Sequence, residues 1–299
     1  MKSEIFAIFI IISLILVIPS VSAQEVSISE KTRQKSVEVE INEEGEIHVK
    51  HVIDSSNSPK QVDLLDGTVE NLIITDEEGE EKQVTVIGNN VALLIFPSNS
   101  DSIIEYDLKD VLFLKDGFWT LDFLYLEPTS FILPEGLDFI FVNERPVNLG
   151  DKKGFLCHGC QMVLEYSLDE PRNIKQVNWE DREFLVEVKT FAEIENFEFN
   201  QPAKEISFTV TGNNQYVTTI IPLELLWEPY VVLLDEEKIF VQQQINNGTH
   251  VWVNIKPQTS GEITIIGTTV VPEFPIIAPL AVGFLMILVL PFIRKFNLR

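Results

Sequence analysis

The sequence predicts an all-β protein with two β-sandwich-like domains outside the cell, an N-terminal signal peptide and one C-terminal transmembrane helix. Three observations lead to this prediction. Short runs that alternate apolar and polar residues recur through the middle of the chain, as they do in half-buried strands. Gly, Asn, Asp and Pro separate these runs and mark turns. An uncharged apolar segment lies near each end of the chain.

The composition excludes several classes of protein. The 299 residues include 46 Asp and Glu against 22 Lys and Arg, for a net charge of -24. This balance argues against a nucleic-acid partner, because such binding needs clustered basic residues to neutralise phosphates. Hydrophobic residues make up 45% of the chain, which is typical of a protein that folds. Two cysteines are too few for a disulfide scaffold or a four-thiolate zinc site, and no cofactor is predicted.

The first 23 residues have the pattern of a secretory signal peptide. Lys2 precedes an apolar run at residues 5–18, and Pro19 ends that run. The small residues at 20–23 then predict cleavage after Ala23. An uncleaved anchor is the alternative. As a helix the run would span only about 21 Å, against about 30 Å of bilayer hydrocarbon.

The other end of the chain predicts a membrane anchor. Residues 274–293 contain no charge and would span about 30 Å as a helix. The basic tail 294–299 follows directly, and positive flanks stay on the cytoplasmic side. We therefore expect a single-pass protein of the cell membrane with most of its chain outside. The lipid membrane is its expected partner, with envelope proteins or glycans as further candidates.

A first β domain is expected at residues 24–168. Its apolar–polar alternation is clearest at Val37, Val39 and Ile41, where glutamates occupy the positions between. The turn at 42–45 and the acidic loop at 76–81 separate neighbouring runs. The same pattern predicts strands at 37–41, 47–53, 69–75, 83–87, 91–96, 102–108, 118–124, 137–142 and 162–168.

A polar linker at 169–173, which contains Pro171, leads into a second β block at 174–269. Residues 222–226 are expected to form one helical turn on a crossing loop. The spacing of the turns predicts an immunoglobulin-like sandwich. Its seven expected strands are 184–191, 206–210, 217–221, 230–234, 239–244, 250–255 and 261–268.

The second block and the C-terminal segment together carry a family resemblance. The chain reads IIPLELL at 220–226, YVVLLD at 230–235 and IIGTTVVPEFP at 265–275. It resembles, over about residues 180–299, exported archaeal surface proteins, chiefly thaumarchaeal, that end in the PEFG-CTERM sorting tail. The resemblance implies a surface location and brings no catalytic residues. Here the tetrapeptide is Pro272, Glu273, Phe274 and Pro275, with proline in the glycine position. The tail is therefore either processed or kept as an anchor.

Both cysteines lie in one C-x-x-C segment, formed by Cys157, His158, Gly159 and Cys160. Exported compartments are usually oxidising, so we expect a disulfide that holds a turn between Phe155 and Met162. Two alternatives stay open. Cys157, His158 and Cys160 are suitable ligands for a soft metal such as copper. The pair also matches a redox motif, which usually precedes a helix that lowers the thiol pKa.

The remaining candidate residues predict no reaction. His48 and His51 are three apart on an expected strand, where they face opposite sides and cannot bind one ion. The acidic run at 76–81 lacks the spacing of a calcium loop and is expected to be a solvated turn. Asn247 begins an N-glycosylation sequon on an expected turn. The tryptophans are expected in core or sandwich-edge positions more than in a carbohydrate groove: Trp119, Trp179, Trp227 and Trp252.

The chain contains no catalytic triad order, His-Glu-x-x-His motif or glycine-rich phosphate loop. We therefore expect a non-catalytic protein with a structural, adhesive or ligand-presenting role. Extracytoplasmic copper binding or redox exchange at the C-x-x-C segment is the alternative, and an extracytoplasmic hydrolase is the third hypothesis.

Overall fold

The computed structural model describes residues 30–31, 33–88, 91–179 and 181–267. These residues form strands and no α-helix, which confirms the all-β class. In the described ranges, no helix is both long and apolar enough to cross a bilayer. The expected signal peptide, its cleavage after Ala23, the tetrapeptide at 272–275, the transmembrane segment at 274–293 and the tail at 294–299 all lie outside the described residues.

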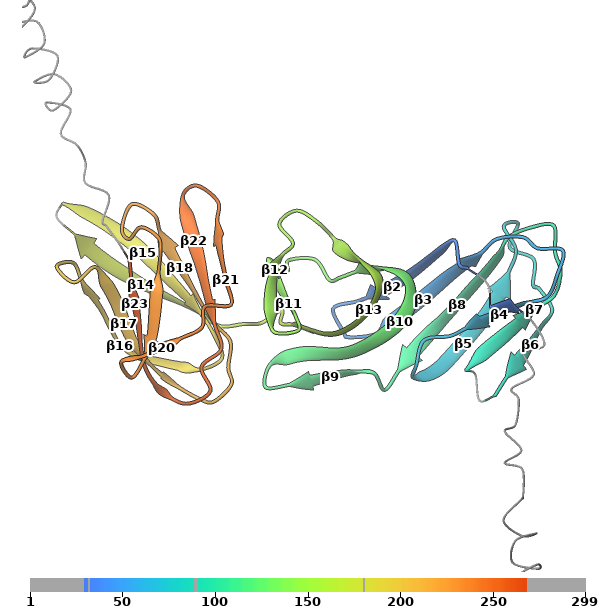
Figure 1. Ribbon diagram of the computed structural model, residues 1–299, viewed down its shortest axis with the longest axis horizontal. Helices are drawn as coiled ribbons and strands as arrows, with labels where there is room; N and C mark the ends of the chain where they lie inside the picture. The colour runs from blue at the N-terminus through green and yellow to red at the C-terminus, as the bar shows by residue number, and fades with distance from the viewer. Residues whose placement is uncertain (1–29, 32, 89–90, 180, 268–299) are drawn as a thin grey trace, which may run out of the picture.

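Strands β1 to β13 form two sheets, which we call the first domain (Figure 1). The smaller sheet has the order β1-β4-β7-β6, and the larger has the order β12-β11-β13-β10-β2-β3-β8-β5 with β9 beside β10. The strands are β1 (Glu30–Lys31), β2 (Ser36–Ile41), β3 (Ile47–Ile53), β4 (Lys60–Asp63), β5 (Thr68–Thr75), β6 (Val84–Ile87), β7 (Ala92–Ile95), β8 (Ser102–Lys109), β9 (Leu112–Lys115), β10 (Phe118–Ile132), β11 (Phe139–Val142), β12 (Arg145–Asn148) and β13 (Gly154–Tyr166).

Alternating side chains build the core of this domain. In β2 and β3 every second residue is buried, so one face of each strand packs inward and the other meets solvent. Val62 of β4 and Leu93 of β7 join Val39 and Ile104 of the larger sheet in a single cluster. The two sheets therefore pack on each other as a sandwich-type fold.

The sequence underestimates the two longest strands. The expected strands 118–124 and 162–168 correspond to β10 and β13, which pair over most of their length. Pro128 in β10 and Gly159 in β13 resemble strand breakers, yet both lie inside the pair, at a register shift between Tyr125 and Pro128. Strands β1, β4, β9 and β12, which have at most four residues each, were not predicted.

Strands β14 to β23 form two five-stranded sheets, which we call the second domain. Their orders are β14-β15-β18-β22-β21 and β16-β17-β23-β19-β20. Buried residues of both sheets form one core. The strands are β14 (Arg172–Trp179), β15 (Arg182–Lys189), β16 (Glu193–Asn200), β17 (Glu205–Thr211), β18 (Val217–Pro222), β19 (Val231–Leu234), β20 (Glu237–Ile239), β21 (Gln243–Asn246), β22 (His250–Ile255) and β23 (Gly261–Ile266).

Three details of the second domain differ from the expectation. β14 was not among the expected strands, and it begins at Arg172, inside the expected linker 169–173. β16 was not expected, because it is an outer strand whose residues are mostly exposed and polar. The expected strand 239–244 divides between β20 and β21, which belong to different sheets. The helical turn at 222–226 is present, since the N–H groups of Leu225 and Leu226 both donate to the Pro222 carbonyl.

An aromatic joint connects the two domains. Tyr216, just before β18, stacks on Phe141 of β11 with ring centroids 3.7 Å apart, and Phe118 packs against both. The Tyr216 hydroxyl donates to Glu165 Oε2 on β13 over 2.5 Å. Lys256 donates to Glu144 Oε1 over 2.9 Å, also from the second domain to the first. Buried rings and charge-assisted hydrogen bonds therefore hold the domains against each other.

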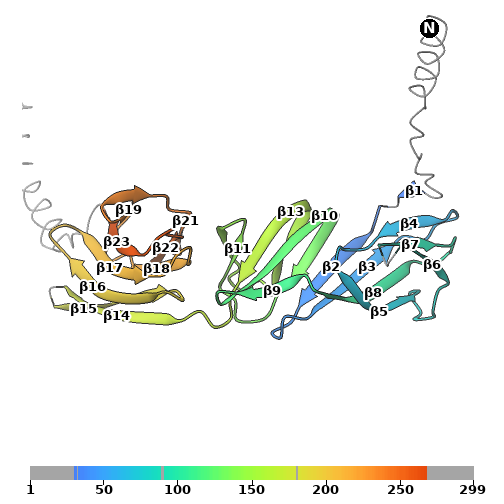
Figure 2. The same cartoon turned by 90° about the horizontal axis from the view of Figure 1, so that it is seen from below.

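The two domains lie end to end in an elongated molecule (Figures 1 and 2). The sheet that contains β4, β6 and β7 occupies one end, and β14 to β23 occupy the other. The joint lies between them, where β11 faces the second domain.

We expect the joint to couple the unfolding of the two domains. We expect Phe141→Ala to cost about 3 kcal/mol, because it removes a buried ring and leaves a cavity. Calorimetry of the full chain in detergent should then show two transitions where the unaltered chain shows one. Phe113→Ala, which alters a ring that is 61% exposed, is the control and should leave one transition. A single transition in the Phe141 variant would contradict a coupling role for the joint.

Candidate functional site

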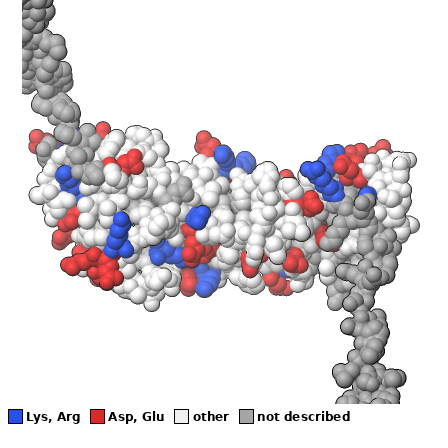
Figure 3. Space-filling model, viewed as in Figure 1, with Lys and Arg blue, Asp and Glu red and all other residues white. Residues whose placement is uncertain are grey.

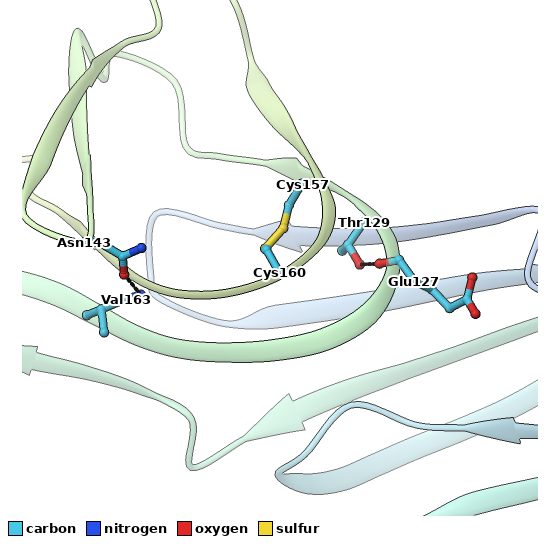
Figure 4. The surroundings of a disulfide bond; sticks show 6 residues. All are labelled: Glu127, Thr129, Asn143, Cys157, Cys160 and Val163. Carbon is cyan, nitrogen blue, oxygen red and sulfur yellow. Dashed lines mark hydrogen bonds between the residues drawn. A yellow bond between two sulfur atoms is a disulfide. The ribbon is translucent and has the colours of Figure 1, made fainter.

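The C-x-x-C segment lies within a strand. Cys157 and Cys160 both belong to β13, and their Cα atoms are 6.0 Å apart, within the usual range for a disulfide. The structure joins them as a disulfide (Figure 4). Residues three apart on a regular strand face opposite sides, so their meeting requires an irregular backbone.

Gly159 supplies that irregularity. Its φ of +65° lies in the left-handed region, and a Cβ here would overlap the Leu126 carbonyl oxygen. Leu126 and Glu127 of β10 together oppose this one glycine, which makes a β-bulge. On β10, Thr129 donates through Oγ1 to the Glu127 carbonyl over 3.0 Å (Figure 4). The bulge reverses the inside–outside alternation of β13 and brings both cysteines to the core side.

The expectation of a turn between Phe155 and Met162 was therefore wrong. That segment is part of a 13-residue strand, and the disulfide spans a bulge. As metal ligands, Cys157 and Cys160 would need free thiolates, which a disulfide does not offer. His158 between them is exposed. Among the described residues, no group of three His, Cys, Asp or Glu side chains is arranged to hold a metal ion.

A series of hydrogen bonds, which we call the circuit, passes through His51. The Leu65 N–H donates to the Tyr106 hydroxyl over 3.0 Å, and that hydroxyl lies 2.9 Å from His51 Nε2. His51 Nδ1 lies 2.6 Å from Gln34 Oε1. The Gln34 amide donates to the Tyr125 hydroxyl, which donates to the Asp63 carbonyl, each over 2.5 Å. The circuit thus returns to the chain segment where it began and joins β3, β8 and β10 to the end of β4.

Each donor in the circuit meets an acceptor, in one direction from the Leu65 N–H to the Asp63 carbonyl, when His51 is neutral. The Gln34 carbonyl oxygen can only accept, so Nδ1 carries the proton and Nε2 accepts from Tyr106. His51 is fully buried, and burial lowers its pKa from 6.5 to about 3. Burial likewise raises the pKa of Tyr106 and of Tyr125, which keeps both hydroxyls protonated as donors.

Two adjoining hollows lie beside this circuit, and Leu124 and Asp66 line both of them. The first has a volume of about 360 Å³ and includes Gln34 and Tyr125 of the circuit. The second, of about 460 Å³, continues toward Phe113. Leu124 and Leu126 of β10 are exposed along this groove. Its lining includes neither lysine nor arginine and combines apolar side chains with five carboxylates. These carboxylates are Asp63, Asp66, Asp110, Asp122 and Glu127.

The structure separates most of the other candidate residues. His48 and His51 do face opposite sides of β3, as expected, and His48 lies 3.0 Å from Asp107 Oδ1. Asp76 organises the acidic turn by accepting from the N–H groups of Glu78 and Glu80. The Asn247 amide oxygen accepts from its sequon partner Thr249.

The tryptophans do not gather in one groove. Trp119 packs against the first core and Trp179 against the second. Trp252 lies near Phe139 at the joint, with ring centroids 6.1 Å apart, and Trp227 is partly exposed. Acidic and basic side chains are interspersed on the face shown in Figure 3, where no large area carries a single sign.

Sequence reasoning missed the role of His51. The alternation of β3 places Ile47, Val49, His51 and Ile53 on one face, and the three apolar members predict that this face is buried. That pattern was sufficient to predict a buried histidine. Gln34 lies 17 residues before its hydrogen-bonding partner His51. Tyr125 lies 91 residues after its partner Gln34, so no local pattern connects these residues.

Comparisons with known proteins add little. No family model matches the chain, and no curated protein matches it. A solved structure of an aminopeptidase N family protein from Idiomarina loihiensis is similar with a TM-score of 0.33 and 10% identity. The similarity covers 50% of this chain and 32% of that one, so this chain spans about a third of that protein.

The disulfide should contribute modestly to stability. Closing so short a loop removes little entropy from the unfolded chain, so Cys157→Ser with Cys160→Ser should cost no more than about 2 kcal/mol. The unfolding midpoint should fall slightly. Thiol labelling with mass spectrometry of the native chain should find both cysteines blocked. Two labelled thiols, or a stoichiometric metal that protects them, would contradict the disulfide.

Neutral His51 makes stability depend on pH. Its folded pKa of about 3 lies below the unfolded value of 6.5, so its contribution is complete above pH 6.5 and is lost as the pH falls toward 3. Between pH 7 and pH 5 this loss should be about 2 kcal/mol. Denaturant unfolding at both pH values measures it. His51→Gln should remove this pH-dependent loss.

Glu170 requires a control, because its effect has the opposite sign. Burial raises its pKa to about 7, despite the nearby Lys189, so it stabilises the fold below pH 4.5 and loses that effect as the pH rises through 7. The chain with His51 and the His51→Gln variant are therefore compared with Glu170→Gln present in both. If the two chains then lose equal stability between pH 7 and 5, His51 is not a buried neutral histidine.

Proposed function

We propose that this chain is a membrane-anchored cell-surface protein of the archaeal type, with a non-catalytic, ligand-presenting role. The signal peptide at 1–23 exports the chain, and residues 274–293 anchor it as a single-pass protein. The second domain, an immunoglobulin-like sandwich, acts as a spacer. The first domain presents its surface to envelope proteins or glycans.

The end-to-end arrangement of the two domains carries this proposal. The described chain ends at Gly267 in the second domain, so an anchor that follows this residue places that domain next to the membrane. The first domain then lies on the far side of the joint (Figure 1). Because buried aromatic rings and hydrogen bonds hold the joint, the first domain is kept at a distance from the membrane. A spacer and a presented domain need this geometry.

The groove along β10 is the surface that the first domain is best suited to present. It is concave, it exposes Leu124 and Leu126, and it lies on a long, paired strand that holds its shape. Exposed apolar residues in a hollow are typical of binding surfaces. Its carboxylates favour ligands that carry a positive charge beside an apolar group.

Topology provides the test. Protease added to intact cells that express the chain should digest the region 24–267, whereas a tag placed after Arg299 should stay protected. Deletion of residues 274–299 should release the protein into the medium, because the apolar segment is then absent. Immunoblots of cells and medium measure both results.

Deletion of residues 294–299 alone is the matched control. It removes the basic tail but keeps the apolar segment, so the chain should stay with the cells. A C-terminal tag that is digested from outside would overturn the proposed orientation. Retention of the chain that lacks 274–299 would overturn the proposed anchor.

A further inference from the structure

The second domain exposes apolar side chains at the end where the chain leaves it. Trp227 is 41% exposed, Val231 36% and Phe240 81%. Gly267, the last described residue, lies against this loop, because a Cβ built on it would be 2.7 Å from the Trp227 carbonyl oxygen. Val231 pairs with Ile266, next to Gly267. Trp227 and Val231 therefore lie next to the exit point of the chain.

Strand register places Phe240 at the same level. Ile239 pairs with Val232, which pairs with Ile265 of β23. Phe240 follows Ile239 and so lies level with Ile266, two strands away, a lateral distance of about 10 Å. The exit end is also the end opposite the joint. Glu205 at the start of β17 pairs with Ile266, and β17 runs from there toward Tyr216 of the joint.

Val231 and Phe240 border a shallow hollow of about 430 Å³, lined by residues 230–232 and 238–241. Lys238 is the one charged residue in that lining, although the chain as a whole has a net charge of -24. Among the described strands, β20 is the outer strand of its sheet, and its exposed residues are Glu237 and Lys238. The exposed ring of Phe240 directly follows this strand, and exposed apolar side chains that gather on one surface are typical of an interaction site.

The length of chain that follows indicates what covers it. Six residues, 268–273, lie between Gly267 and Phe274, where the uncharged segment begins. Fully extended, the seven Cα-to-Cα steps from Gly267 to Phe274 span at most about 25 Å. The bilayer surface is therefore within one short tether of the exposed rings. Tryptophan and phenylalanine beside a lysine are the side chains that settle at a membrane interface, where the rings meet lipid and the ammonium stays in water.

We infer that Trp227, Val231 and Phe240 form a membrane-contact surface that seats the second domain on the lipid interface. This inference rests on the proposed anchor at 274–293. The bilayer is the occupant that the tether length and the side-chain chemistry favour, and a second copy of the chain is the alternative that the test must separate.

Fluorescence quenching in nanodiscs tests the inference. The full chain is placed at one copy per disc, with lipids brominated near the headgroup end of their acyl chains. Trp227→Phe should lose part of the quenching that the unaltered chain shows. Phe240→Trp, made in that variant, should restore quenching. Phe113→Trp is the matched control, since Phe113 is a comparably exposed ring in the first domain, and it should add none.

The outcomes separate the inference from the proposed function. Elution of the chain without discs in size-exclusion chromatography would show that the anchor itself fails. Chain that stays with the discs, while Phe240→Trp adds no quenching, would overturn the contact surface and leave the anchor intact. Where quenching is absent, the emission of the Phe240→Trp variant is also measured in bromine-free detergent. An emission that shifts with protein concentration would assign the surface to a second copy of the chain and overturn the inference.

Discussion

The long antiparallel pair of β10 and β13 is the constraint on which the rest of the first domain depends. Phe118 at the start of β10 and Glu165 near the end of β13 both reach the joint. Tyr125 in the middle of β10 belongs to the His51 circuit, and residues 129–132 pair with β2 in the core. The same strand pair connects all three regions, with a register on each side of the bulge, so a slip of one residue on either side would reverse which side chains face inward there.

The bulge at Gly159 allows one strand pair to serve those regions. Without the extra residue on β10, the inside–outside pattern of β13 would place Cys157 and Met162 on opposite faces, yet both are buried. The disulfide therefore stabilises an irregularity that the glycine already requires. Its energetic contribution is small, but it lies where the strand pair bends and where the groove along β10 begins.

How much the sequence predicts depends on the range of the interaction. Strand β3 was predicted at its observed bounds, because period-two alternation is a local property of seven residues. The disulfide pair was predicted from chemistry and compartment. The bulge was not, because it is defined by the pairing of residue 159 with a segment more than thirty residues earlier. The groove and the joint depend on contacts between distant elements and left no local signal.

Orientation at a membrane requires more than an anchor. A tether of six residues allows an attached domain to rotate, because a short flexible segment limits distance and leaves direction free. The aromatic joint fixes the first domain to the second, but it cannot fix either one to the bilayer. A contact surface at the exit end would supply the missing constraint. Joint and contact surface lie at opposite ends of the same strands, about 20 Å apart along β17. Together they would give the tethered pair of domains a fixed orientation relative to the membrane, with the groove along β10 held away from the lipid.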